Sequence, residues 1–234
     1  MTPQRKTVEL SLGYASLGLF GVSIAVLAWF LLDGVNRPEG PEESFWGGLF
    51  GGLESRGDAR ATFNALLVLG WGLLHSVMAR PRFKQALARR VPARLEPAIY
   101  AMTASACLIL LCLLYRPIPR VVYALEGGPA LLVRMIFWSG WFLFVWCWFH
   151  LDLLEVAGLR PILRAMEVQP RTDEPFRPTG PFLWCRHPVE LAFLIAFWAA
   201  PVMTAGHLLF ASCMSLYTFI GIDLEERKML ALQG

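Results

Sequence analysis

The sequence predicts an all-α protein: a polytopic bundle of transmembrane helices with about six apolar segments, the last two forming a tight helical hairpin. Of the 234 residues, 56% are hydrophobic and only 17% are charged, and the mean hydropathy is +0.50. Soluble domains are far less apolar than this. Uncharged runs long enough to cross a bilayer recur along the chain, and Lys and Arg cluster in alternate loops. Together these observations predict an integral membrane protein.

The whole chain, 1–234, is expected to form a single membrane-embedded domain with three sections. Residues 1–60 hold the first span and an outer loop. Residues 61–154 hold three spans, and residues 155–234 hold a long polar loop, the hairpin and an acidic C-terminal segment.

The first expected span is residues 12–32, which contain no charged side chain. This run is longer than a signal-peptide core, so it predicts a retained helix. Residues 33–60 are rich in Gly, Pro and Glu and predict a surface loop.

Three further spans are expected at 61–79, 97–115 and 131–154. Residues 80–94 lie between two of them and carry six basic side chains, with apolar residues at helical spacing. This pattern predicts a short amphipathic helix along the membrane surface.

Residues 189–204 and 207–222 are two apolar runs of 16 residues that are separated only by Ala205 and Gly206. They predict an antiparallel hairpin with its turn at these two residues. Each arm would be roughly 24 Å long, so a full crossing and a deep re-entrant hairpin both remain open. His207, at the far end of the hairpin, is expected to be an interface histidine.

The distribution of positive charge predicts the orientation. With alternating spans, fifteen of the 21 Lys and Arg residues fall on one face. By the positive-inside rule this face is cytoplasmic, so both termini are expected in the cytoplasm. The polar loop 155–185 lies on the same face, and long loops of this kind are typically functional.

A polar motif, Arg186-His187-Pro188, precedes the first arm of the hairpin. Proline suits the first turn of a helix, where its missing N–H is not needed, so a helix is expected to begin there. The helix N-terminus and Arg186 favour an anion. The second arm returns the chain to the same face, so Glu225 and Glu226 are expected beside this motif.

Such a site suits a ligand that carries both a negative and a positive charge. A carboxylate would meet Arg186, and an amine would meet Glu225 or Glu226. S-adenosyl-L-methionine has both groups, and its sulfonium could face the rings of Phe182 or Trp184. The alternative is a purely structural salt bridge between the helix ends.

Other functions are less favoured by the sequence. Five cysteines without a CxxC spacing indicate neither a disulfide framework nor a metal site, and no metal is expected. Basic and aromatic residues are not interleaved as on a nucleic-acid surface, so no nucleic acid is expected. No charge lies in the middle of a span, which argues against a transporter. The expected partners are a small substrate and membrane lipid, and no oligomeric state is predicted.

Several motifs together resemble one family. The chain is similar to the membrane methyltransferase superfamily that includes isoprenylcysteine carboxyl methyltransferase, and above all to the bacterial methanethiol S-methyltransferases. The motifs are HSVMARPRFK (75–84), YRPIP (115–119), GLR (158–160), RHP (186–188), LIAFWAAPVMTAGHLLFA (194–211) and LEER (224–227).

The resemblance implies transfer of a methyl group from S-adenosyl-L-methionine to a small apolar thiol, giving dimethyl sulfide from methanethiol. It implies that Arg186, His187, Glu225 and Glu226 hold the cofactor at the cytoplasmic face, and that the membrane is the bacterial inner membrane. The thiolate is the nucleophile, so a base is needed, and His187, His150 or Glu190 could take the thiol proton.

The chain departs from the family pattern before GLR, where an Asp-His pair is usual and Asp152 is followed here by Leu153. His150, expected on the same helix face, could substitute for the missing histidine. Two alternatives stay open: methylation of another acceptor, such as a selenol, sulfide or prenylcysteine carboxylate, or a non-catalytic accessory protein of the superfamily.

Overall fold

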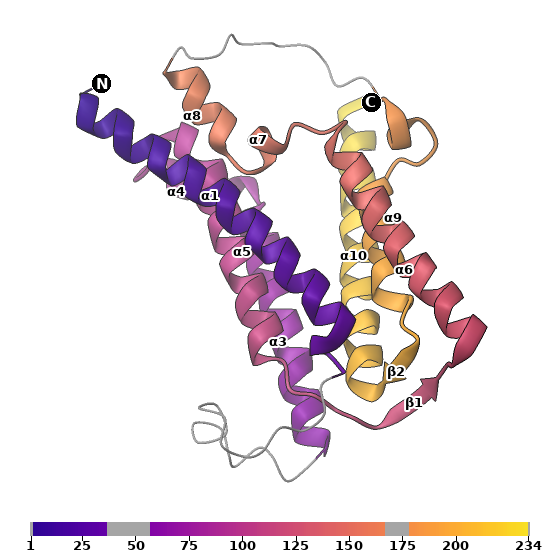
Figure 1. Cartoon of the computed structure of the whole chain (residues 1–234). Helices are drawn as coiled ribbons and strands as arrows, with labels where there is room; N and C mark the ends of the chain where they lie inside the picture. The colour runs from indigo at the N-terminus through magenta and orange to yellow at the C-terminus, as the bar shows by residue number, and fades with distance from the viewer. Residues whose placement is uncertain (1, 37–56, 167–177, 234) are drawn as a thin grey trace. The chain divides into compact units, whose positions relative to one another are not determined.

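The computed structural model describes residues 2–36, 57–166 and 178–233, and it is helical apart from one pair of short strands in these residues (Figure 1). The long helices are α1 (Pro3–Trp29), α3 (Gly57–Met78), α5 (Glu96–Leu114), α6 (Gly127–Trp148) and α10 (Ala205–Gln233). The shorter helices are α4 (Pro81–Ala88), α7 (Leu153–Val156), α8 (Leu159–Ala165) and α9 (Pro188–Trp198). Single helical turns are η1 (Phe30–Gly34), η3 (Ala93–Leu95) and η4 (Gly180–Leu183), and the strands are β1 (Val121–Ala124) and β2 (Val202–Thr204).

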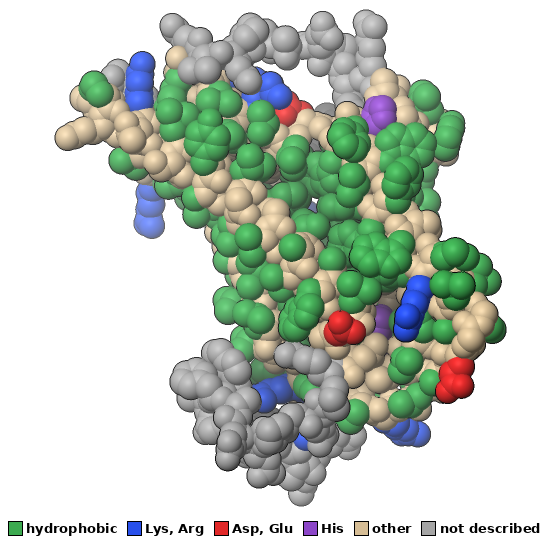
Figure 2. Space-filling view, in the orientation of Figure 1, with side chains coloured by type: hydrophobic (Ala, Val, Ile, Leu, Met, Phe, Trp, Pro, Cys, Tyr) green, Lys and Arg blue, Asp and Glu red, His purple; other side chains and the backbone are tan. Residues whose placement is uncertain are grey.

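Five segments of the described chain are long and apolar enough to cross a bilayer: Pro3–Gly34, Ala59–Met78, Ala93–Leu114, Gly127–Trp148 and Ala205–Ala231. They overlap the four spans expected before the hairpin and the second hairpin arm. The all-α class and the membrane-protein class are therefore confirmed. Hydrophobic side chains dominate the face shown in Figure 2, as expected for helices that contact lipid. The orientation of the spans stays a prediction.

Contacts divide the chain into two compact units. The first comprises Met1–Ala28, Gly70–Leu113 and Trp148–Pro178, and the second comprises Trp29–Leu69, Leu114–Cys147 and Thr179–Gly234. The expectation of one domain stays a prediction.

In the first unit, buried polar contacts join α1 to α5 and to the α7–α8 segment. The Ser16 hydroxyl lies 3.2 Å from the carbonyl oxygen of Ala98 and 2.7 Å from that of Ala157. The guanidinium of Arg94 donates to the buried carboxylate of Glu9 at 2.6 and 2.7 Å. These bonds satisfy groups that would be costly to leave unpaired away from water.

The same unit contains the predicted amphipathic helix, which is α4. It also shows that part of the loop expected at 155–185 is helical, since α8 occupies Leu159–Ala165 and begins after Gly158. Residues 167–177 of this expected loop and residues 37–56 of the outer loop lie outside the described residues.

In the second unit, α6, α9 and α10 pack together (Figure 1). Gly140 of α6 permits a close approach of α6 to α9, because an added Cβ would lie 2.9 Å from Ile195 Cγ2 and 3.0 Å from the Ala192 carbonyl oxygen. Small residues at helix crossings are typical of membrane bundles. The Trp198 indole N–H donates to the Ser215 hydroxyl at 2.9 Å and joins α9 to α10.

The hairpin differs from the prediction. Helix α9 has only 11 residues and ends at Trp198, and α10 begins at Ala205, where the turn was expected. Pro201 lacks an N–H and disfavours helical backbone in the residue before it, which explains the early end. The connecting residues form β2, which pairs antiparallel with β1. At about 16 Å, α9 is too short to cross the roughly 30 Å hydrocarbon core by itself.

The expectation for His207 is wrong, because its side chain is 1% exposed and lies within the protein. Its Nε2–H donates to the Phe197 carbonyl at 2.8 Å, so Nδ1 is the acceptor and lies 3.4 Å from the Asn36 amide nitrogen. The Thr204 hydroxyl donates to Asn36 Oδ1 at 2.8 Å. This network holds the end of the first span against the hairpin connection.

Candidate functional site

Helix α9 begins as the sequence predicts, with Pro188 at its first position and His187 before it. The backbone of His187 is not yet helical, but its carbonyl accepts from the Leu191 N–H at 3.0 Å. The imidazole makes no capping bond. The side chain is therefore available for a contact outside the helix.

That contact is to Glu226 of α10, which also binds Arg186. Arg186 Nη1 donates to Glu226 Oε2 at 2.9 Å, and His187 Nε2 lies 3.0 Å from Glu226 Oε1. The carboxylate thus bridges two consecutive residues at the start of α9. The side chain of Arg186 is 71% exposed, so much of its guanidinium can reach a ligand. The structure thus brings Arg186, His187 and Glu226 together, as the sequence predicts.

Glu190 and Glu225 complete the polar cluster. One ligand atom each from His187, Glu190 and Glu225 lies within 4.8 Å of the others. Glu190 stands on the first turn of α9, whereas Glu225 extends from α10 and is exposed. Glu226 contacts His187 directly. Together with Arg186, these four residues of the expected site therefore lie at one place.

The two expected aromatic residues precede this cluster. Phe182 is half-buried in the turn η4, and Trp184 is 79% exposed immediately after it. The Trp184 ring contacts Trp146 of α6 edge-on, with centroids 5.7 Å apart. The exposed indole of Trp184 stands two residues before Arg186 in the chain.

The sequence interpretation missed an aromatic group between α6 and α9. The ring of Phe193 lies 5.0 Å from that of Phe144, 6.4 Å from that of Trp141 and 5.9 Å from that of Phe197. Phe193 and Phe197 follow Glu190 on α9 by three and seven residues, so all three are on one side of the helix. That spacing in the sequence could have predicted this aromatic group.

His150 is not where it was expected. Helix α6 ends at Trp148, and His150 lies in the turn that follows, so the expected helix face shared with position 153 is wrong. The Asp152 carboxylate caps α7, accepting from the backbone N–H groups of Leu154 and Glu155 at 3.1 and 3.2 Å. It also pairs with Arg160. Because Asp152 starts a new helix, α6 cannot run on to residue 154. His150 belongs to the first unit, and its role stays a prediction.

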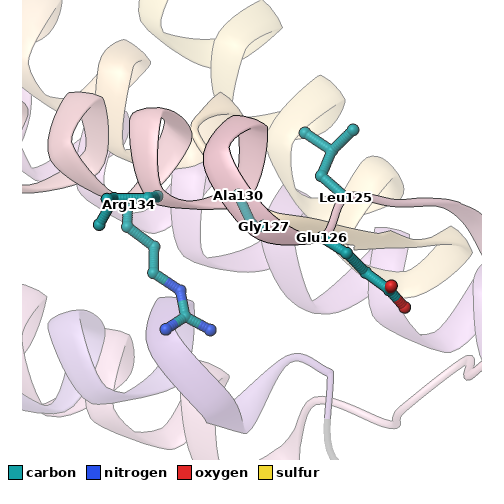
Figure 3. Close-up of a pocket in the computed structure, with 6 residues that line it drawn as sticks. Leu125, Glu126, Gly127, Ala130 and Arg134 are labelled. Carbon is teal, nitrogen blue, oxygen red and sulfur yellow. The ribbon is translucent and has the colours of Figure 1, made fainter.

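A pocket of about 360 Å³ lies at the other end of α6. It is lined by Leu125, Glu126, Gly127, Ala130, Leu131 and Arg134, and Figure 3 shows Glu126 just before α6 and Arg134 about two turns into it. Twelve residues of α6 separate Arg134 from Trp146, or about 18 Å along the axis. The pocket is therefore distinct from the polar cluster.

Comparison with known proteins gives relatives of one kind. Methanethiol S-methyltransferase 1 of Bradyrhizobium diazoefficiens is 39% identical over 173 residues, which are 73% of this chain and 60% of the relative. Methanethiol S-methyltransferase of Mycobacterium tuberculosis is 39% identical over 172 residues, which are 72% of this chain and 70% of the relative. The enzyme of that name from Pseudomonas deceptionensis is 37% identical over 173 residues, or 66% of its length.

The chain spans 60% of the length of the first relative and 70% of the second. No family model and no solved structure matches it. The identity to the Mycobacterium tuberculosis protein and the share of that protein covered are enough to assign a family. The chain belongs to the methanethiol S-methyltransferase family.

Proposed function

We propose that the chain transfers a methyl group from S-adenosyl-L-methionine to methanethiol, giving dimethyl sulfide, at the cytoplasmic face of the membrane. The observation that carries this proposal is the 37–39% identity to relatives named methanethiol S-methyltransferase. The polar cluster at the start of α9 supports it independently.

The residues of this cluster fit a zwitterionic cofactor. The exposed guanidinium of Arg186 suits a carboxylate, and the carboxylates of Glu225 and Glu226 suit an ammonium or a ribose diol. The exposed ring of Trp184, with Phe182 before it, offers an aromatic face for a cation. When bound, S-adenosyl-L-methionine supplies an electrophilic methyl group on a sulfonium.

The acceptor side is proposed along α9, beyond Glu190. The aromatic group around Phe193 is apolar and would exclude water, and a small apolar thiol partitions readily into such surroundings. His187 or Glu190 would take the thiol proton, because both lie in the cluster. Catalysis would then consist mainly of holding the thiolate in line with the methyl group.

The first experiment measures cofactor binding and headspace dimethyl sulfide from the full-length protein, purified in detergent and supplied with methanethiol. Arg186→Ala should weaken cofactor binding about 10- to 100-fold, because one charge-assisted contact is lost. Arg227→Ala is the matched control, since Arg227 is 74% exposed and pairs with Asp223 instead. It should behave like the wild type.

Cofactor binding by wild-type protein, together with dimethyl sulfide that Arg186→Ala forms poorly, would support the proposal. A wild-type protein that binds no S-adenosyl-L-methionine would overturn it. Equal binding by Arg186→Ala and wild type would remove Arg186 from the cofactor site.

A further inference from the structure

We propose that the pocket at the start of α6 binds the headgroup of an amine-bearing phospholipid, with its phosphate at Arg134 and its ammonium at Glu126. The pocket has a volume of about 360 Å³, and both charged side chains line it. It lies at the end of α6 away from the polar cluster of the candidate functional site. The inference is therefore independent of the proposed methyl transfer.

Both charged side chains of the pocket are available to a ligand. Arg134 and Glu126 are exposed, and neither forms an ion pair or a side-chain hydrogen bond with another described residue. Figure 3 shows the two side chains extending to the same side of α6. The pocket thus presents one positive and one negative charge that the described part of the chain does not neutralise.

The position of Arg134 along α6 explains why it needs an anionic partner. It lies seven residues after Gly127, or about 10 Å into a helix that is long enough to cross a bilayer. Its neighbours Leu132, Met135 and Ile136 are exposed apolar side chains, as expected for a surface that contacts lipid. A charge in such surroundings is costly unless it reaches the membrane surface or a group of opposite charge.

The helix geometry directs Arg134 towards the membrane surface. Side chains on a helix tilt towards its N-terminus, which here is the end that carries the pocket. Gly127 and Ala130 lie on the same face of α6 as Arg134, seven and four residues before it. These small residues leave space beside the guanidinium that larger side chains would fill. A lipid phosphate at the membrane surface is within reach of an arginine in this position.

The exposed face of α6 fits the acyl chains of the same lipid. Leu131 lines the pocket, and Met135, Trp138 and Phe142 follow it at i+4, i+7 and i+11, so the four lie along one face of the helix. Their exposed fractions are between 56% and 70%. This apolar stripe begins at the pocket and continues into the span. A phospholipid matches both the pocket and the stripe, whereas free phosphate matches the pocket alone.

Glu126 determines which headgroup fits. A primary ammonium donates hydrogen bonds to a carboxylate and is attracted by its charge. A choline headgroup carries the charge but has no N–H to donate. A glycerol headgroup has no positive charge, so its phosphate leaves Glu126 without a partner. The site should therefore prefer phosphatidylethanolamine to phosphatidylcholine and phosphatidylglycerol.

Native mass spectrometry of the full-length protein in detergent tests the site. Delipidated protein is titrated with each of the three lipids, all with identical acyl chains. The wild type should bind one phosphatidylethanolamine more tightly than either other lipid. Arg134→Ala should weaken this binding at least about fivefold, and Glu126→Gln should abolish the preference for phosphatidylethanolamine. Arg120→Ala is the matched control, because Arg120 is exposed and close in the chain but does not line the pocket.

Three results would overturn the inference. The first is equal affinity of the wild type for the three lipids, and the second is Arg134→Ala that binds phosphatidylethanolamine as tightly as Arg120→Ala. The third comes from competition with glycerophosphoethanolamine, which has the headgroup without acyl chains. It should leave the lipid bound, and displacement at concentrations close to that of the lipid would show that the apolar stripe adds nothing. No methyl transfer is measured, so the result does not depend on the proposed function.

Discussion

Arg186 and His187 are adjacent in the sequence, yet both contact the same carboxylate on another helix. Glu226 lies 40 residues from Arg186 and receives one contact on each oxygen. Its orientation is therefore fixed by two partners. Because Arg186 still exposes 71% of its side chain, the contact with Glu226 orients the guanidinium and leaves it open to a ligand. A salt bridge and a binding site are thus compatible readings of these residues.

Gly158 also shows how a single residue can decide local structure. Its φ is +78°, in the left-handed region, and a Cβ would lie 2.1 Å from the backbone nitrogen of Ala98. Glycine is required there both for the backbone conformation and for the close approach of the chain to α5. The motif GLR therefore has a structural reason for its first residue.

We predict that Gly158→Ala lowers the free energy of unfolding by more than about 2 kcal/mol, since strain and a backbone clash act together. Thermal unfolding of the purified protein in detergent measures the effect. Gly70→Ala is the control, because nothing lies within 4 Å of its added Cβ. An unchanged unfolding temperature for Gly158→Ala would show that the chain at Ala98 can move away at little cost.

At the scale of elements, one ion pair ties α1 to the turn before α5. The carboxylate of Glu9 is 4% exposed and accepts from Arg94, which lies in η3. Arg5 also contacts Glu9 at 3.3 Å, but its side chain is largely exposed. The bidentate contact from Arg94 should therefore carry most of the stabilisation.

Removing one partner of this pair should destabilise the first unit. Arg94→Ala leaves the Glu9 carboxylate buried without its main partner and should cost about 3 kcal/mol. Arg5→Ala should cost less than about 1 kcal/mol, as for other exposed pairs. Thermal unfolding is measured for both variants. A double-mutant cycle with Glu9→Gln, alone and combined with Arg94→Ala, gives the coupling free energy between the two side chains. Equal losses for Arg5→Ala and Arg94→Ala would contradict the account.

The spans that the sequence predicted well are those where an apolar run determines the helix by itself. Segments 61–79 and 97–115 differ from the observed helical spans by only a few residues at each end. The hairpin was predicted less well, because its connection depends on pairing between β2 and the distant strand β1. No local pattern shows that pairing, although Pro201 alone indicates that α9 could not continue.

At the scale of the molecule, the same limits apply to the candidate site. Arg186 and Glu226, which flank the two predicted hairpin arms, could be paired from the sequence, because a hairpin must return the chain to its starting face. The proximity of Glu190 to Glu225 could not, since it depends on the rotation of α9 and α10 about their axes. His150 was misplaced because the apolar run continues to Leu154, whereas α6 ends at Trp148 and Asp152 caps a new helix, α7.

Methyl transfer from S-adenosyl-L-methionine to methanethiol is the central claim, and an isotope label tests it most directly. Purified wild-type protein is supplied with methanethiol and with S-adenosyl-L-methionine whose transferable methyl group is trideuterated, and the headspace is analysed by mass spectrometry. The account predicts dimethyl sulfide that carries one trideuterated methyl group, with much less formed by Arg186→Ala. Unlabelled dimethyl sulfide, or none above a protein-free control, would contradict it.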